Sequence, residues 1–335
     1  MKATTLKKAA LVAGSLSFLA GSAFSQTAVS GAGGYETLTI RGEGKFTTIG
    51  LRLHEPQVVS GTFDSQDGSS LSDADVNFDD VLTDGTRYLV EITGGTSSEG
   101  TVIEVDSWSG SDLSVDGAAA DDVTDYTIRA AKTINDVFGA DNSLGLSPDT
   151  TGAGGASVGK IFVPDGAGFK SYSYIDLGQA FQGWADSLLN PAGDTPLNYV
   201  DAIIVNEPGA EDLSLVVTGM VKTSPTVLPV DQLFTYVGTV YPTGSTLANS
   251  GLSGSLTADT TGAGGGDSVY VPKDDASGYT RYQFLDLGAA FSGWADNLLA
   301  PSDDVELTSG VVIDQNGTGA AYNAVTSAPD FYADL

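Results

Sequence analysis

The sequence predicts an all-β protein, built as antiparallel sandwich or barrel-like domains with a duplicated C-terminal unit and few short helices. Alternating apolar and polar segments recur about every ten residues, separated by clusters of Gly, Asp and Ser. The 43 glycines supply the positive φ angles that tight turns need. A unit of about 110 residues occurs twice, which predicts two domains of one fold.

Residues 1–25 have the three regions of a secretory signal peptide. Three lysines precede an apolar run, Ala9–Ala20, and small residues at Ala23 and Ser25 fit the −3 and −1 positions of a cleavage site. The run is shorter than the roughly 20 residues that cross a bilayer. We therefore expect an exported protein without a membrane span, located outside the cell, on its surface or in the periplasm.

Residues 26–130 follow as an unrepeated N-terminal β-domain. Its apolar and polar residues alternate in several short segments bounded by turn-forming clusters such as 64–70 and Gly94-Gly95. The strands expected here cover residues 35–40, 45–53, 58–63, 88–93 and 101–105.

The repeated units are expected at residues 131–222 and 223–335. The heptapeptide DTTGAGG stands at Asp149–Gly155 and again at Asp259–Gly265. The strings YSYIDLG and AFQGWADSLL of the first unit return as YQFLDLG and AFSGWADNLL in the second. The strands expected in these units include residues 160–163, 171–177, 202–205, 213–221 and 234–240.

Two helices are expected in the first unit. Thr133–Phe138 offers a Thr cap, an acid three residues later and a glycine stop. In Ala180–Leu189 the apolar residues, including Trp184, fall at helical spacing, and Pro191 ends the segment. The second unit repeats this pattern around Trp294.

Several segments give the chain a resemblance to a known group of proteins. The strings TGMVKT and LFTYVGTVYPTGSTLANSGL within residues 217–252 are similar to those of a paralogous family of exported proteins from verrucomicrobial bacteria, as are residues 88–105 and 126–139. The resemblance covers most of the chain after the leader. It implies export and an all-β fold, and it supplies no catalytic residues or mechanism because the family has no established activity. This chain departs from the family in its acidity and its DTTGAGG duplication.

Composition excludes several classes of function. The 14 basic residues face 43 acidic ones, for a net charge of −29, so we expect no nucleic acid as a partner and little affinity for anionic lipid. Without cysteine there are no disulfides, thiolate metal sites or thiol nucleophiles. The single histidine, His54, excludes two-histidine zinc sites and is expected at the surface or at a strand end.

No catalytic constellation stands out. Gly155–Gly159 matches G-x-S-x-G, but a nucleophile elbow needs a helix after it and a histidine later in the chain. We interpret the match as a glycine-rich turn. Paired carboxylates for glycoside hydrolysis usually include one acid buried against aromatic residues, whereas the acids here cluster in polar turns. The prediction is that the protein is not an enzyme and requires no cofactor.

A calcium site is one interpretation of the segment DADVNFDDVLTD. Its oxygen-bearing residues have the spacing of an EF-hand loop, although Phe78 replaces the turn glycine. The ligands would be Asp73, Asp75, Asn77, Asp79 and Asp84. The same segment also fits a strand with its acids facing solvent and with Ala74, Val76 and Phe78 inward, which is the preferred interpretation.

Aromatic residues offer a second candidate site. Trp184 and Trp294 could stack on sugar rings, and Tyr172 and Tyr282 could line a binding face, although both tryptophans also fit the core. The preferred function is an exported, non-enzymatic structural or surface-associated component of the cell envelope or extracellular matrix. The alternatives are a carbohydrate-binding β-module and a Ca²⁺-dependent adhesion or assembly protein. The partners considered are other copies of the chain and a surface polysaccharide.

Overall fold

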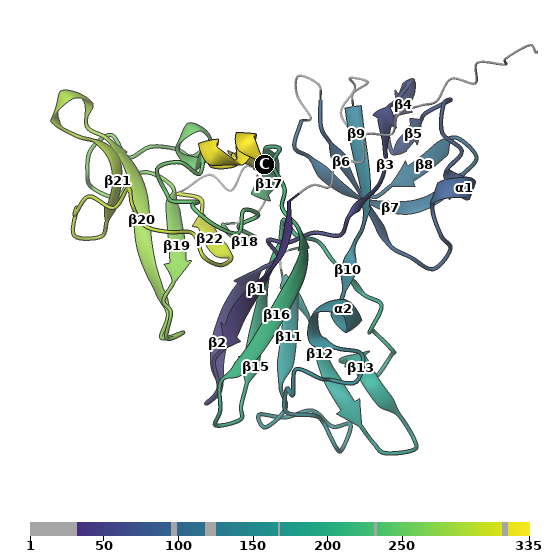
Figure 1. The fold of residues 1–335 in the computed structure, drawn as a ribbon. Helices are drawn as coiled ribbons and strands as arrows, with labels where there is room; N and C mark the ends of the chain where they lie inside the picture. The colour runs from purple at the N-terminus through teal and green to yellow at the C-terminus, as the bar shows by residue number, and fades with distance from the viewer. Residues whose placement is uncertain (1–31, 95–98, 118–124, 167, 231–232, 317–320) are drawn as a thin grey trace, which may run out of the picture. The chain divides into compact units, whose positions relative to one another are not determined.

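The computed structural model describes residues 32–94, 99–117, 125–166, 168–230, 233–316 and 321–335, so the expected signal peptide lies outside it. The prediction of an all-β fold is confirmed, because strands make up 46% of the chain and helices 7% (Figure 1). Every strand pair within the named sheets is antiparallel. No described helix is long and apolar enough to cross a membrane.

The two sequence repeats form two sheets with the same strand order. The first has the order β13-β12-β11-β15-β2, with β13 (Gln182–Asp186), β12 (Gly168–Asp176), β11 (Lys160–Asp165), β15 (Ala202–Glu207) and β2 (Lys45–Gly50). The second has the order β21-β20-β19-β22-β18, with β21 (Ser292–Asp296), β20 (Tyr279–Asp286), β19 (Ser268–Pro272), β22 (Val311–Asp314) and β18 (Phe234–Val237). Strand for strand, the described residues therefore contain one architecture twice.

Shorter pairings extend the equivalence of the two copies. In the first copy, β1 (Gly33–Ile40) pairs with β16 (Leu213–Met220), and in the second β17 (Thr226–Val230) pairs with β23 (Tyr322–Thr326). The pair of β10 (Lys132–Thr133) with β14 (Pro196–Leu197) corresponds to the bridge between Thr246 and Glu306.

Strand pairing divides the chain differently from the sequence pattern. Residues 33–50, which the pattern groups with the N-terminal domain, supply β1 and β2 to the first copy. Between β2 and β10 lies a separate sheet of order β3-β9-β6-β7-β8-β5-β4 (Figure 1). Its strands are β3 (Gln57–Thr62), β4 (Ser65–Asp67), β5 (Ser70–Ser72), β6 (Tyr88–Ile92), β7 (Val102–Ser109), β8 (Asp112–Val115) and β9 (Asp125–Ala130). We call this sheet, with its connecting loops, the inserted domain.

Two hydrophobic clusters follow from this arrangement. One contains residues of both copies, among them Trp184, Ile203, Trp294 and Ile313. The other lies within the inserted domain and is centred on Phe78, Tyr126 and Ile128. The inserted domain therefore has a core of its own, while Leu89 of β6 packs into the first cluster.

The short helix α2 (Ile134–Phe138) forms where the sequence predicts it. The Thr133 hydroxyl accepts from the Asp136 backbone N–H at 3.2 Å, and the Asp136 carboxylate accepts from the Thr133 N–H at 2.8 Å. Gly139 ends the helix with φ of 84°. The second copy retains this reciprocal pair between Thr246 and Asn249, ahead of the 3₁₀ turn η1 (Leu252–Gly254).

The helix expected at Ala180–Leu189 is wrong. Residues 182–186 form β13, and residues 187–190 form a turn; 292–296 and 297–300 do the same in the second copy. The spacing of apolar residues misleads because Trp184 packs across the sheet on Tyr174, with ring centroids 5.5 Å apart. Cross-strand pairing of β13 with β12 thus overrides a helical pattern that Gly183 already weakens.

The strand expected at Asp73–Asp79 is also wrong. Residues 73–77 form a loop, and Phe78–Val81 form the short helix α1. Asp73 is buried rather than exposed, and its carboxylate accepts a hydrogen bond from the Tyr126 hydroxyl at 2.7 Å. The remaining short helical elements are the 3₁₀ turns η2 (Gly288–Ala290) and η3 (Asp330–Asp334).

Candidate functional site

The residues expected as calcium ligands make separate contacts. The other carboxylate oxygen of Asp73 accepts from the backbone N–H of Asp75, and Asp79 accepts from the N–H of Gly110. Asn77 donates to Asp80, and Asp84 is exposed in a turn. Among the described residues, no group of three or more His, Cys, Asp or Glu side chains is placed to hold a metal ion. Calcium binding by this chain stays a prediction.

The tryptophans expected as sugar platforms lie in the core. Trp184 and Trp294 are 2% and 1% exposed, and Tyr172 is buried, so the indole faces are not open to a ligand from solvent. The Trp184 indole N–H donates to the Gly139 carbonyl at 2.7 Å, which ties β13 to the end of α2. Tyr282 is half-buried on β20, and its role in binding stays a prediction.

The duplicated DTTGAGG segments are turns organised around one carboxylate. Asp149 accepts hydrogen bonds from the backbone N–H groups of Thr151, Gly152 and Gly154 and from the Thr151 hydroxyl. Asp259 receives the same four bonds in the second copy, at 2.7–3.0 Å. The strongest repeat in the sequence therefore builds a turn, and its carboxylates are fully engaged inside it.

These bonds favour the ionised carboxylate. Burial raises the pKa of Asp259, but the N–H groups of Thr261, Gly264 and Gly262 outweigh that effect and leave the pKa at about 2. The pKa of Asp149 is lowered by the same set of donors. The low pKa values of Asp149 and Asp259 thus result from the fold of the turn, since each hydrogen-bond donor belongs to that turn.

Replacing Asp259 with asparagine tests the role of this turn. The asparagine amide keeps one acceptor oxygen and replaces the other with an NH₂ group, which cannot accept from the backbone N–H groups of the turn. We therefore expect the free energy of unfolding to fall by about 2 kcal/mol, the scale of hydrogen bonds to a charged group. Urea unfolding followed by circular dichroism measures the change. Asp286→Asn is the matched control, because the exposed Asp286 accepts one weak bond, from Gly288 at 3.3 Å. Equal effects of the two substitutions would contradict this role.

The segment matching G-x-S-x-G does not form a nucleophile elbow. Ser157 is exposed in the loop that follows the DTTGAGG turn, and the next element is the strand β11 rather than a helix. The interpretation of this match as a glycine-rich turn is therefore consistent with the local structure.

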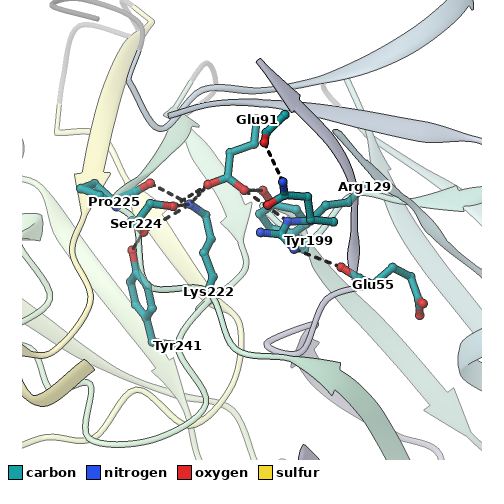
Figure 2. A network of polar contacts seen from close by, with 10 residues as sticks. Glu55, Glu91, Arg129, Tyr199, Lys222, Ser224, Pro225 and Tyr241 are labelled. Atoms are coloured by element: carbon teal, nitrogen blue, oxygen red, sulfur yellow. Dashed lines mark hydrogen bonds and ion pairs between the residues drawn. The ribbon is translucent and has the colours of Figure 1, made fainter. Parts of the chain in front are cut away.

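A buried ionic network joins the inserted domain to the first copy (Figure 2). Glu91 on β6 forms ion pairs with Lys222, which follows β16, and with Arg129 on β9, whose Nε lies 3.6 Å from the Glu91 carboxylate. The Tyr199 hydroxyl donates to the same carboxylate at 3.3 Å. The side chains of Glu91 and Lys222 are 2% and 1% exposed, so the two charges depend on each other and on their hydrogen bonds.

Further contacts saturate the ammonium group of Lys222. It donates to the carbonyl oxygens of Ser224 and Pro225, at 3.2 and 2.9 Å, and to the Ser224 hydroxyl. The Tyr241 hydroxyl donates to the Ser224 carbonyl at 2.8 Å. Burial raises the pKa of Glu91, but the charge and hydrogen bonds of Lys222 hold it below its ordinary value. Glu91 and Lys222 therefore satisfy each other, and the pair acts as a clamp between two units.

His54 lies beside this network. Of the two positions expected from the sequence, the surface or a strand end, the surface position is wrong. It is 4% exposed, and its ring centroid is 4.2 Å from that of Tyr199. Burial, together with the positive charges of Arg129 and Lys222, lowers the pKa of His54 to about 3. The imidazole is consequently neutral at physiological pH.

Sequence reasoning missed this network. One usable signal was Glu91 itself, a lone acid in the otherwise apolar strand YLVEI, because a buried carboxylate requires a partner. Nothing in the sequence pairs Glu91 with Lys222, which lies far along the chain. Comparison of the chain with protein-family models, with curated proteins and with solved structures gave no match.

Proposed function

We propose that this chain is an exported, non-enzymatic structural or surface-associated protein of the cell envelope or extracellular matrix. One observation carries the proposal: the polar groups that the sequence duplicates most faithfully bind the chain to itself. Asp149 and Asp259 hold turns, and their partners are backbone N–H groups of the same turn. Groups used in this way build and preserve a scaffold.

Two further features support this function. The N-terminal sequence has the pattern of a secretory signal peptide, and the acidic composition favours a soluble, well-hydrated surface. The buried clamp between Glu91 and Lys222 joins two units that each have apolar residues to bury. Such a clamp suits a structural protein, because it fixes one unit to the other.

Export is tested by producing the whole chain in a Gram-negative bacterium and fractionating the cells. We expect the protein outside the cytoplasm, with a mass that corresponds to cleavage before Gln26. Replacing Leu11 and Leu16 with arginine interrupts the apolar run and should retain the uncleaved protein in the cytoplasm. Full-length protein in the cytoplasm in both cases would contradict export.

Self-assembly is tested by the solution mass of the secreted protein in calcium and in EDTA. Chains of strongly negative charge repel one another, and divalent ions both screen this repulsion and bridge carboxylates. We expect multimers in calcium that return to single chains in EDTA, measured by size exclusion with light scattering. A single-chain mass in both solutions would contradict calcium-dependent assembly.

A further inference from the structure

A cleft lies between the inserted domain and the first copy. It encloses about 1090 Å³. Residues 84–87 and Val105–Trp108 line one side, and Phe169–Tyr172 with the turn at Asp186–Leu188 line the other. Residues 191–196 complete the lining. A cleft of this size is large enough for an extended small ligand.

The residues around this cleft are held by strand pairing. Pro196, in its lining, belongs to β14, which pairs with β10 at Thr133. Just before β10, the backbone N–H of Ala131 donates to the carbonyl of Arg87 at 2.9 Å. This bond connects the side of the cleft that contains Arg87 to the segment that leads into β10. The cleft is thus preformed, and a ligand would not have to order its walls.

A β-bulge shapes the side of the cleft that carries Trp108. The register of β7 against β8 shifts between Val105 and Ser107, so Asp106 stands outside the regular pairing. Bulges re-aim side chains and are frequent beside binding sites. Trp108 packs edge-on against Tyr88, with ring centroids 5.6 Å apart, and remains partly exposed in the cleft.

The chemistry of the lining selects among ligands. An aromatic ring surrounded by carboxylates and basic groups suits a sugar, which presents an apolar ring face and hydroxyl groups at its rim. Aspartates outnumber basic residues in this lining: Asp84, Asp106, Asp186 and Asp194 stand against Arg87 and Lys170. With the net charge of −29, this balance disfavours uronate and sulfated glycans.

We propose that this cleft binds a neutral oligosaccharide, with Trp108 as the stacking surface and the charged residues of the lining as hydrogen-bonding partners. The proposal adds a ligand to the scaffold role and does not depend on it, because binding is measured on purified protein. It also differs from the site expected from the sequence: the buried tryptophans Trp184 and Trp294 take no part.

Fluorescence gives a direct test, because Trp108 is the partly exposed one of three tryptophans and the other two are buried. The secreted protein is titrated with hexaoses of cellulose, mannan, xylan and laminarin, and with an oligogalacturonate of matched length. We expect at least one neutral hexaose to shift the tryptophan emission maximum and to reduce the quenching of that emission by acrylamide. The oligogalacturonate should do neither.

Variants locate the site. Trp108→Ala should weaken binding by calorimetry at least tenfold, whereas Phe331→Ala, at an exposed aromatic residue far along the chain, should leave it unchanged. Trp108 also packs on the core of the inserted domain, so its removal could act through folding, and a second variant is needed. Ser107 is exposed in the cleft. Ser107→Leu adds bulk there and should block binding without changing the melting temperature. Absence of binding to all four neutral hexaoses, preference for the oligogalacturonate, or unchanged binding by Ser107→Leu would overturn the proposal.

Discussion

Replacing Lys222 with methionine is expected to lower the free energy of unfolding by about 3–5 kcal/mol, the largest effect of any single substitution proposed for this chain. Methionine fills a similar volume but leaves the Glu91 carboxylate buried without its main counter-charge. The cost comes from this uncompensated charge rather than from lost packing. Urea unfolding at pH 7, followed by tryptophan fluorescence and by circular dichroism, measures the change.

Two comparisons separate this explanation from a general effect of removing a lysine. Lys170 forms an ion pair with Asp165 at 3.1 Å, with both side chains more than half exposed, so Lys170→Met should lower the stability far less than Lys222→Met does. In Lys222→Met/Glu91→Leu both buried charges are gone, and the double variant should lose less stability than the sum of its single variants. Strict additivity would show that Glu91 and Lys222 do not act as a pair.

The second large effect is a loss of stability in mild acid that originates at His54. The folded protein holds this imidazole neutral, with a pKa of about 3, whereas the unfolded chain protonates it near 6.5. Between these values the unfolded state binds the additional proton, so stability falls as the pH falls and levels off below the folded pKa. From pH 6.5 to 4.5 the loss should be about 2 kcal/mol.

His54→Phe tests this assignment, because phenylalanine keeps a ring against Tyr199 and cannot take up a proton. From pH 6.5 to 4.5 we expect the unfolding free energy of the wild-type protein to fall by about 2 kcal/mol relative to that of the variant. Other groups, such as Glu36, whose pKa burial raises, titrate in both proteins and cancel in the difference. A constant difference between the two proteins would assign the acid sensitivity to another group.

Local patterns in the sequence predicted many of the longer strands and the helix that starts after Thr133. Alternating apolar residues and turn residues indicate the local conformation of a few neighbouring positions. This information is sufficient to predict strands such as β2, β6 and β15. The segment around Trp184 shows the limit of this reasoning. Its apolar spacing fits a helix, and only pairing with β12, a distant property of the chain, makes it a strand.

The site residues were harder to predict, for the same reason. The sequence placed the acids in polar turns, but it did not show that Asp149 accepts hydrogen bonds from the backbone N–H groups of its own turn. The exposure expected for His54 was wrong because the segment after β2 runs against β16, where His54 bridges Met220. The Glu91–Lys222 pair and the cleft beside Trp108 depend on how separate sheets meet, which a single sequence does not encode locally.

The pairing of β1 with β16 has a consequence for the order in which the protein forms. Gly33 pairs with Met220, so β1 cannot pair with β16 until the entire inserted domain has been synthesised. Contacts so distant in sequence slow folding, because the loop between them must be closed first. The second copy closes over a shorter stretch, from Thr226 to Thr326. The two copies, alike in architecture, should therefore fold at different rates, with the later-made copy the faster.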